Sequence, residues 1–177
     1  AINPDVCAWL RAEDTVIDYP VVHGTDNEYY LKHLYTGQKN RNGSVFVDCG
    51  NTGLFTEQNT LIFGHNMQSG AMFGTLKGYK KQDYYDAHPT MTLYTPAGDY
   101  TLELIAGTVE DGAYTFAKCS FDSSEEFFDY VADLKSRSTF QSSVEVQEDD
   151  RLVSLCTCTY EFSNARYVVV GKLTALP

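Results

Sequence analysis

Short strand-like runs recur along the whole chain, whereas helical periodicity is confined to a few stretches. Many of these runs are short, and they end at turn residues such as Asn42-Gly43 or Pro96-Ala97-Gly98-Asp99. Two of them close the chain, and both are rich in Val, Leu and Thr. We expect strands at residues 15–22, 44–48, 60–63, 91–95, 100–108, 152–160 and 166–173.

Helical signals are strongest near the N-terminus and before the last two strands. Asn3-Pro4-Asp5 resembles an N-cap, a first-turn proline and a first-turn acid, which predicts a helix through Trp9 and Leu10. Asp26 predicts a second short helix, so that residues 1–35 form an N-terminal helical segment packed on the strands. Ser123 and Glu126 form a capping box before an apolar stripe. That stripe comprises Phe127, Phe128, Val131 and Leu134, and shorter helical turns are expected at 72–76 and 82–87.

The count of about seven or eight strands with three or four inserted helices favours a mostly antiparallel, closed β-barrel over a βαβ sheet. The 177 residues fit one domain, 1–177, with a core of useful size. No run of about 18 apolar residues and no signal peptide is visible.

Charge and cysteine usage narrow the possible functions. The net charge of −11 argues against a nucleic-acid surface and against binding to anionic membranes. The five cysteines are irregularly spaced, and no pair of them has histidines at zinc-ligand spacing. An odd number leaves at least one thiol free, and we expect neither a disulfide framework nor a metal site.

The candidate chemistry lies at the strand ends. Cys158 ends one closing strand, Arg166 begins the next, and His65 follows a third strand in Gly64-His65-Asn66. A thiol needs a base or a cationic neighbour to react at neutral pH, and a guanidinium can stabilise an oxyanion. Taken separately, a strand cysteine is more often a small buried residue, and a lone histidine or arginine is more often a surface residue. The three together predict a site for acyl transfer only if they converge at one mouth of the barrel.

Several motifs resemble those of class B sortases, the cysteine transpeptidases of Gram-positive surfaces. Ser154-Leu155-Cys156-Thr157-Cys158 is similar to the Thr-Leu-x-Thr-Cys signature of the family, with serine at its first position. Arg166-Tyr167-Val168-Val169-Val170 matches the family's arginine strand, and residues 59–67 match its histidine segment. The N-terminal helical segment and the helix before the Cys158 strand are typical of class B.

The resemblance implies a sortase-type barrel and a set of functional residues. Cys158 is implied as the nucleophile, His65 as the acid and base, and Arg166 as the residue that stabilises the oxyanion or positions the substrate. Implied substrate-binding residues are Asn27, Leu31, Phe116, Thr157 and Thr159, although Leu31 and Phe116 could equally be core residues. Cys156 should face the same way as Cys158, since strand residues two apart share a face, but it is expected to be non-catalytic. No cofactor is expected.

The resemblance also implies partners and a location. The substrate is expected to be the C-terminal sorting signal of a secreted surface protein, of an Asn-Pro-x-Thr type, cleaved after threonine. The acceptor is expected to be an amine of a peptidoglycan precursor or of a pilin, at the outer face of the membrane, with any anchor in a segment outside this sequence. The alternatives left open are a hydrolytic cysteine peptidase, a thiol–disulfide protein using Cys156 and Cys158, and a non-catalytic adhesion barrel.

Overall fold

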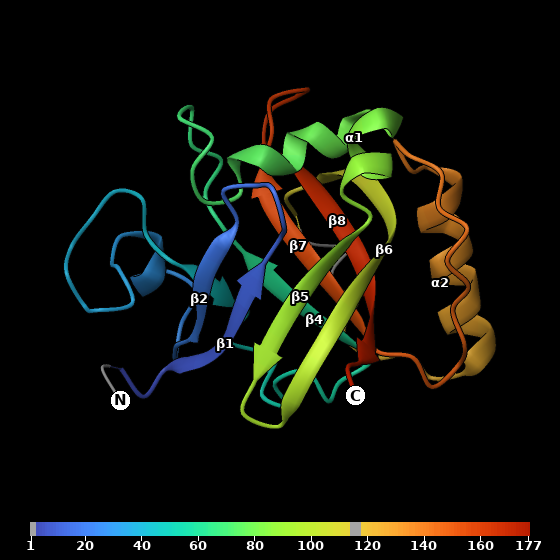
Figure 1. The fold of residues 1–177 in the computed structure, drawn as a ribbon, viewed down its shortest axis with the longest axis horizontal. Coiled ribbons are helices and arrows are strands. Elements are labelled where there is room, and N and C mark those ends of the chain that lie inside the picture. The colour runs from blue at the N-terminus through green and yellow to red at the C-terminus, as the bar shows by residue number, and fades with distance from the viewer. Residues whose placement is uncertain (1–2, 114–117) are drawn as a thin grey trace.

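The computed structural model describes residues 3–113 and 118–177. Within these residues, eight strands close into a barrel in the order β1-β2-β3-β4-β7-β8-β6-β5 (Figure 1). The closed and mostly β architecture expected from the sequence is confirmed. The strands are β1 Val6–Arg11, β2 Asp18–His23, β3 Val45–Val47, β4 Asn59–Phe63, β5 Thr90–Thr95, β6 Gly98–Asp111, β7 Leu152–Cys158 and β8 Ala165–Ala175.

The barrel is mixed because two of its strand pairs are parallel. β2 pairs with β3 and β4 pairs with β7 in parallel, and the other neighbours in the closed sheet are antiparallel. Parallel neighbours need a long connection between them. Between β4 and β7 that connection carries η2 Gly74–Lys80, α1 Gln82–Ala87, β5, β6 and α2 Ser124–Ser136. As a result, β4 and β7 end at the same edge of the sheet.

The helix before β7 forms as its sequence predicts. The Ser123 side chain accepts a hydrogen bond from the Glu126 backbone N–H at 3.2 Å, as an N-cap should. Phe127, Val131 and Leu134 are buried, whereas Phe128 stays exposed. Figure 1 shows α2 lying along the outside of the barrel beside β6.

The prediction of a helix after Asn3-Pro4-Asp5 is wrong, because residues 6–11 form strand β1. Exposure alternates from Ala8 to Arg11, and β1 hydrogen-bonds to both β2 and β5. The capping signal is used for tertiary contacts instead. The Asn3 amide donates to the Tyr30 hydroxyl at 2.8 Å, and that hydroxyl donates to Asp5 at 2.6 Å. Pairing on both edges of β1 therefore outweighs a local helix signal.

The second N-terminal helix is much shorter than expected. Asp26 accepts hydrogen bonds from the backbone N–H groups of Glu28 and Tyr29, as a cap would. Only one turn follows, the 3₁₀ helix η1 Tyr29–Leu31. The chain then turns back, and Asn40 donates to the Lys32 carbonyl. The segment before β3 is thus a strand pair followed by an ordered loop rather than a helical appendage.

The core has two layers, one inside the barrel and one on its outer wall. Alternate residues of β7 point to opposite sides, so that Val153 and Leu155 belong to the inner layer while Leu152 and Cys156 belong to the outer one. The outer layer is covered by Phe127, Val131 and Leu134 of α2, and elsewhere by Tyr30 of η1. Within the described residues, no helix has the length and apolar character needed to cross a membrane.

Candidate active site

A groove of about 270 Å³ opens on the outer wall of the barrel, where β4 and β7 end and β8 begins. The segment around η1 forms the opposite side. The sequence-predicted residues His65, Cys158 and Arg166 all line this groove, although they come from three different strand ends. Among the described residues, its lining comprises Asn27, Leu31, Phe46, Phe63, Gly64, His65, Cys156, Thr157, Cys158 and Arg166.

Strand register brings the thiol and the guanidinium together. Cys158 and Arg166 are directly opposite each other in the antiparallel β7–β8 pair, which places their Cβ atoms about 5 Å apart. Cys158 is exposed. Arg166 donates to the carbonyls of Asn164 and Ala165 at 3.3 and 3.1 Å, and it makes no ion pair with any described residue. Its positive charge therefore remains available to the groove.

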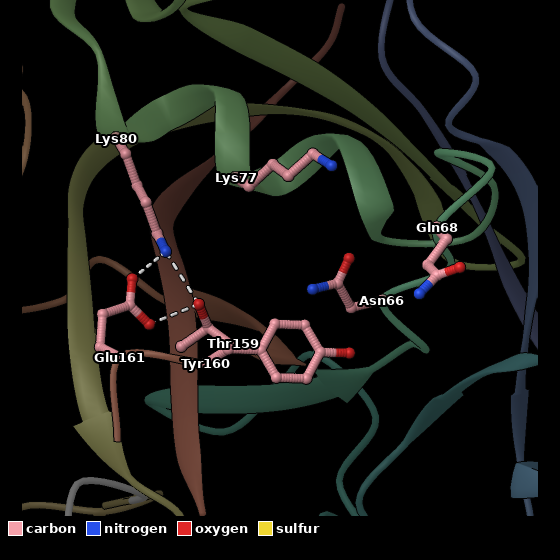
Figure 2. Close-up of a pocket in the computed structure, with 7 residues that line it drawn as sticks. All are labelled: Asn66, Gln68, Lys77, Lys80, Thr159, Tyr160 and Glu161. Carbon is pink, nitrogen blue, oxygen red and sulfur yellow. Dashed lines mark hydrogen bonds and ion pairs between the residues drawn. The ribbon is translucent and has the colours of Figure 1, made fainter. Parts of the chain in front are cut away.

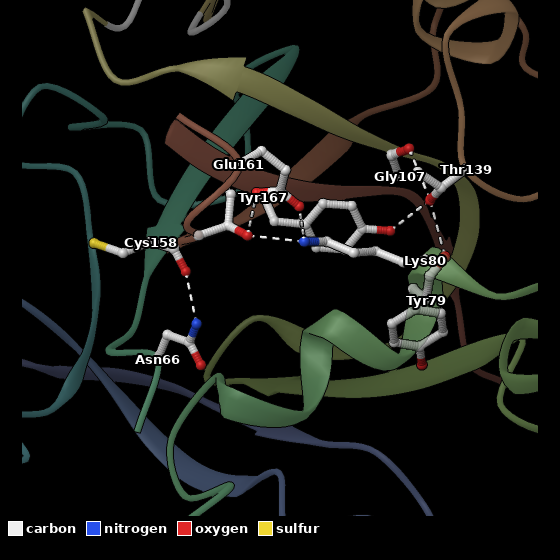
Figure 3. A network of polar contacts seen from close by, with 9 residues as sticks. Asn66, Tyr79, Lys80, Gly107, Thr139, Cys158, Glu161 and Tyr167 are labelled. Atoms are coloured by element: carbon white, nitrogen blue, oxygen red, sulfur yellow. Dashed lines mark hydrogen bonds and ion pairs between the residues drawn. The ribbon is translucent and has the colours of Figure 1, made fainter. Parts of the chain in front are cut away.

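The loop carrying His65 is fastened to β7 by three hydrogen bonds. The Gly64 N–H donates to the Cys156 carbonyl at 3.2 Å, and the Thr157 hydroxyl donates to the Gly64 carbonyl at 2.7 Å. The Asn66 amide donates to the Cys158 carbonyl at 2.9 Å, as Figure 3 shows. These bonds fix the position of the imidazole relative to the thiol across 93 positions of sequence.

One nitrogen of the His65 ring is already engaged. Nε2 lies 2.7 Å from the Leu31 carbonyl oxygen, which can only accept a hydrogen bond. Nε2 therefore carries a proton, and Nδ1 is the ring nitrogen left to exchange a proton in the groove. The same bond ties the η1 side of the groove to the strand side.

Glycine is required at position 64 by packing rather than by an unusual backbone angle. A Cβ at Gly64 would lie 2.7 Å from the ring of Phe73, which is completely buried. Phe73 also donates its N–H to the His65 carbonyl at 2.9 Å. The close approach of this ring holds the histidine loop flat against the barrel.

Cys156 shares the groove face with Cys158 but differs in its environment. Cys156 is buried and Cys158 is exposed, although both line the groove. Burial raises the pKa of the Cys156 thiol to about 12, against the opposing effect of the Arg166 charge. Cys156 is therefore a neutral thiol at ordinary pH and a poor nucleophile.

The substrate-binding residues expected from the sequence are only partly brought together. Asn27, Leu31 and Thr157 line the groove. The amide of Asn27 donates to Asp48 at 3.0 Å and its oxygen accepts from the Cys49 N–H at 2.8 Å, so this side chain also anchors the loop after β3.

Of the two remaining expected substrate-binding residues, only Thr159 is among the described residues. Thr159 lies outside the groove, where its hydroxyl accepts from Lys80 at 2.8 Å and donates to Glu161 at 2.6 Å. Phe116 falls outside the described residues.

The sequence analysis missed the aromatic wall of the groove. Phe46 and Phe63 are cross-strand partners in β3 and β4, with ring centroids 5.4 Å apart. The signal was present, because Phe63 is two positions before His65 and residues two apart on an extended segment share a face. Among the described residues, no cluster of three or more His, Cys, Asp or Glu side chains could hold a metal ion.

Comparison with known proteins agrees with this geometry. The family model described as the sortase domain matches residues 10–174. Sortase B of Listeria monocytogenes is 38% identical over 174 residues, covering 97% of this chain and 71% of that protein. A sortase B–substrate complex from Staphylococcus aureus superposes with a TM-score of 0.93 at 28% identity, covering 99% and 82% of the two chains. Sortase B of Clostridium perfringens gives 0.91 at 36% identity, covering 98% and 96%.

A closed barrel with a thiol, an imidazole and a guanidinium at one groove is the arrangement of a cysteine acyltransferase. The chain belongs to the sortase family, and the relatives named above are class B members. Sortases are cysteine transpeptidases that sort proteins to the cell wall at the Gram-positive surface, and this chain is one of them.

Proposed function

We propose that Cys158, His65 and Arg166 carry a transpeptidation in which a C-terminal sorting signal is cleaved after threonine and joined to an amine of the cell wall. The observation that carries this proposal is their common groove, in which the register of β7 and β8 sets Arg166 opposite Cys158. Residues 1–177 then act as one catalytic domain.

In the first step the Cys158 sulfur attacks the threonine carbonyl carbon. A C–S bond forms, the carbonyl π electrons move to oxygen, and collapse of this oxyanion breaks the C–N bond to give a thioacyl enzyme. Cys158 suits this role because it is exposed, whereas the neighbouring Cys156 is buried and held neutral. A thioester retains enough energy for attack by an amine.

His65 transfers the protons of both steps. It gives a proton to the departing amine, and later removes one from the attacking amine, a form of catalysis that is worth about 10²–10⁴ in rate. The bond from Nε2 to the Leu31 carbonyl supports this role, because it fixes the orientation of the ring and leaves Nδ1 to exchange protons in the groove.

Arg166 stabilises the negative charge that develops on the carbonyl oxygen, or holds the substrate backbone beside it. Two of its hydrogen bonds go to neighbouring backbone carbonyls and none goes to a described carboxylate, which leaves donors for the substrate.

The groove favours a short extended peptide that carries an apolar residue within a few positions upstream of the threonine. Leu31, Phe46 and Phe63 supply apolar wall, and Asn27 and Thr157 supply polar atoms. An Asn-Pro-x-Thr type signal fits this division, and the likeness to a sortase B solved as a substrate complex supports a peptide in this position.

The acceptor is an amine presented at the outer face of the membrane, with the enzyme attached through a segment outside this sequence. A solved sortase B complexed with triglycine, 28% identical with a TM-score of 0.91, supports an amino-terminal glycine as one form of acceptor. Disulfide exchange through Cys156 is disfavoured by its burial and raised pKa.

The test is trapping of the thioacyl enzyme. The protein is incubated with a panel of Asn-Pro-x-Thr peptides and analysed by intact mass spectrometry, with and without triglycine as acceptor. We expect an acyl adduct on Cys158, a ligated product with triglycine, no adduct in Cys158→Ala, and large losses in His65→Ala and Arg166→Ala. Cys156→Ala is the matched control and should form the adduct. An adduct on Cys156, or turnover in Cys158→Ala, would refute the proposal.

A further inference from the structure

A second and larger cavity, of about 370 Å³, lies next to the end of β7, and Figure 2 shows the residues that line it. Asn66 and Thr159 form its boundary with the groove, because Asn66 donates to the Cys158 carbonyl and Thr159 is the next residue along the chain. The other lining residues are Gln68, Lys77, Lys80, Tyr160 and Glu161. The lining carries three charged side chains, two side-chain amides and the aromatic ring of Tyr160, whereas among the described residues the aromatic rings of the groove are the apolar Phe46 and Phe63 and the imidazole of His65.

One wall of this cavity is held together by an ion-pair cluster. The Lys80 ammonium pairs with Glu161 and donates to the Thr159 hydroxyl, as Figure 2 shows, and it lies 5.1 Å from the centroid of the Tyr167 ring. Tyr167 in turn shares a 2.6 Å hydrogen bond with Thr139. This wall is built into the barrel, and Lys80 has its charge neutralised by Glu161.

Lys77 is the charged lining residue without a partner. It comes from η2, is exposed, and makes no ion pair or hydrogen bond with any described residue. In Figure 2 its ammonium extends toward the side where Asn66 and Gln68 lie. Because Lys80 and Glu161 cancel, Lys77 leaves the cavity with one net positive charge.

We propose that this cavity, here called the acceptor cavity, binds the body of the incoming amine acceptor, and that Lys77 selects acceptors bearing a carboxylate a few bonds from the reacting amine. The acceptor must approach the thioester from a side that the sorting peptide does not fill, and the acceptor cavity adjoins Cys158 across Asn66 and Thr159. This inference rests on the transpeptidation proposed above.

The charge of the acceptor cavity serves the reaction in two ways. The positive charge of Lys77 attracts the carboxylate of an acceptor, whereas an acceptor that ends in a neutral amide gains no such attraction. A positive surrounding also disfavours the ammonium form of the acceptor, so that a larger fraction of it is the neutral amine that attacks. If Lys77 were only a solvated surface lysine, neither effect would be seen. An experiment can therefore distinguish a surface lysine from one that binds the acceptor.

The experiment compares triglycine with triglycine amide as acceptors for the thioacyl enzyme, at fixed sorting-peptide concentration and low salt. These acceptors differ in one terminal charge. For the wild type we expect kcat/KM to be about two- to fivefold higher for the acid than for the amide, the size of an exposed charge pair. Lys77→Gln should bring the ratio to one. Lys81→Gln is the matched control, because Lys81 is exposed and lies outside the cavity lining, and it should keep the wild-type ratio.

The outcomes separate this inference from the proposal beneath it. Without an acceptor, Lys77→Gln should form and hydrolyse the thioacyl enzyme at the wild-type rates. If the wild type itself forms no adduct, the transpeptidation proposed above is refuted. A normal adduct with equal acid-to-amide ratios in wild type and Lys77→Gln overturns the role of Lys77. Loss of the wild-type preference at 1 M salt, where charge pairs are screened within about 3 Å, supports it.

Discussion

Thr157→Val is the substitution that best tests how the site is assembled. Valine has nearly the shape of threonine, so the change removes the hydroxyl but little volume. Thr157 is buried, and its hydroxyl donates to the Gly64 carbonyl at 2.7 Å, directly before His65. Without that donor a half-buried carbonyl is left short of a partner, which costs about 1–3 kcal/mol.

The expected change in stability can be measured directly. A loss of about 1–3 kcal/mol corresponds to a decrease in Tm of roughly 2–12 °C for a chain of this size, measured by thermal unfolding. The activity should fall further than the stability, since the histidine loop loses one of its three bonds to β7. A displacement of the imidazole by a fraction of an ångström costs between about tenfold and 10²-fold in kcat/KM.

The control is Thr157→Ser, which keeps the hydroxyl and loses the methyl group. It should retain the hydrogen bond and most of the activity. The loss in Thr157→Val should appear in kcat more than in KM for the sorting peptide, because the hydroxyl proton is used within the protein. A Thr157→Val enzyme with wild-type Tm and kcat would refute the coupling of His65 to β7 through this bond.

Three further predictions follow from particular contacts. Gly64→Ala should lower the free energy of unfolding by about 1–3 kcal/mol, because its Cβ would overlap the buried Phe73 ring, and denaturant unfolding measures this. Alkylation at pH 8 followed by peptide mapping should label Cys158 and leave Cys156 unmodified, since burial raises the pKa of Cys156 to about 12; equal labelling would contradict this account. The hydrogen bond from Lys80 lowers the pKa of Glu161 to about 2, so Lys80→Met should return it toward the ordinary value of about 4.3, as an NMR titration would show. Because the folded-state pKa is lowered, the pair adds stability above about pH 4.3 and loses it as the pH falls toward 2, by less than about 1 kcal/mol at this exposed position.

The sequence was informative where chemistry and strand ends coincide. Glycine after a strand, with histidine next, predicted the position of His65, and the patterns ending at Cys158 and beginning at Arg166 predicted the edge where the groove lies. The groove lies on the outer wall of the barrel at that edge. Its position depends on which residues of each strand face outward. Strand alternation alone does not say which side is the interior.

The prediction failed where distant contacts decide the local structure. Asn3 and Asp5 resemble a helix start, but the Tyr30 hydroxyl binds both side chains and β1 pairs on two edges. The resemblance implied Thr159 as a substrate-binding residue, but among the described residues it lines the neighbouring cavity rather than the groove. Its partner Lys80 is 79 positions away, and nothing in the local sequence indicates that contact.

The parallel pairing of β4 with β7 has a consequence for how the enzyme becomes active. The pairing that brings the imidazole to the sulfur joins residues about 93 positions apart in sequence, and such non-local pairing slows folding because the connection must close first. A partly folded chain would carry an accessible thiol with no base beside it. Catalytic turnover by this protein therefore reports that the barrel has folded completely. Incompletely folded molecules at the cell surface should not react with peptides.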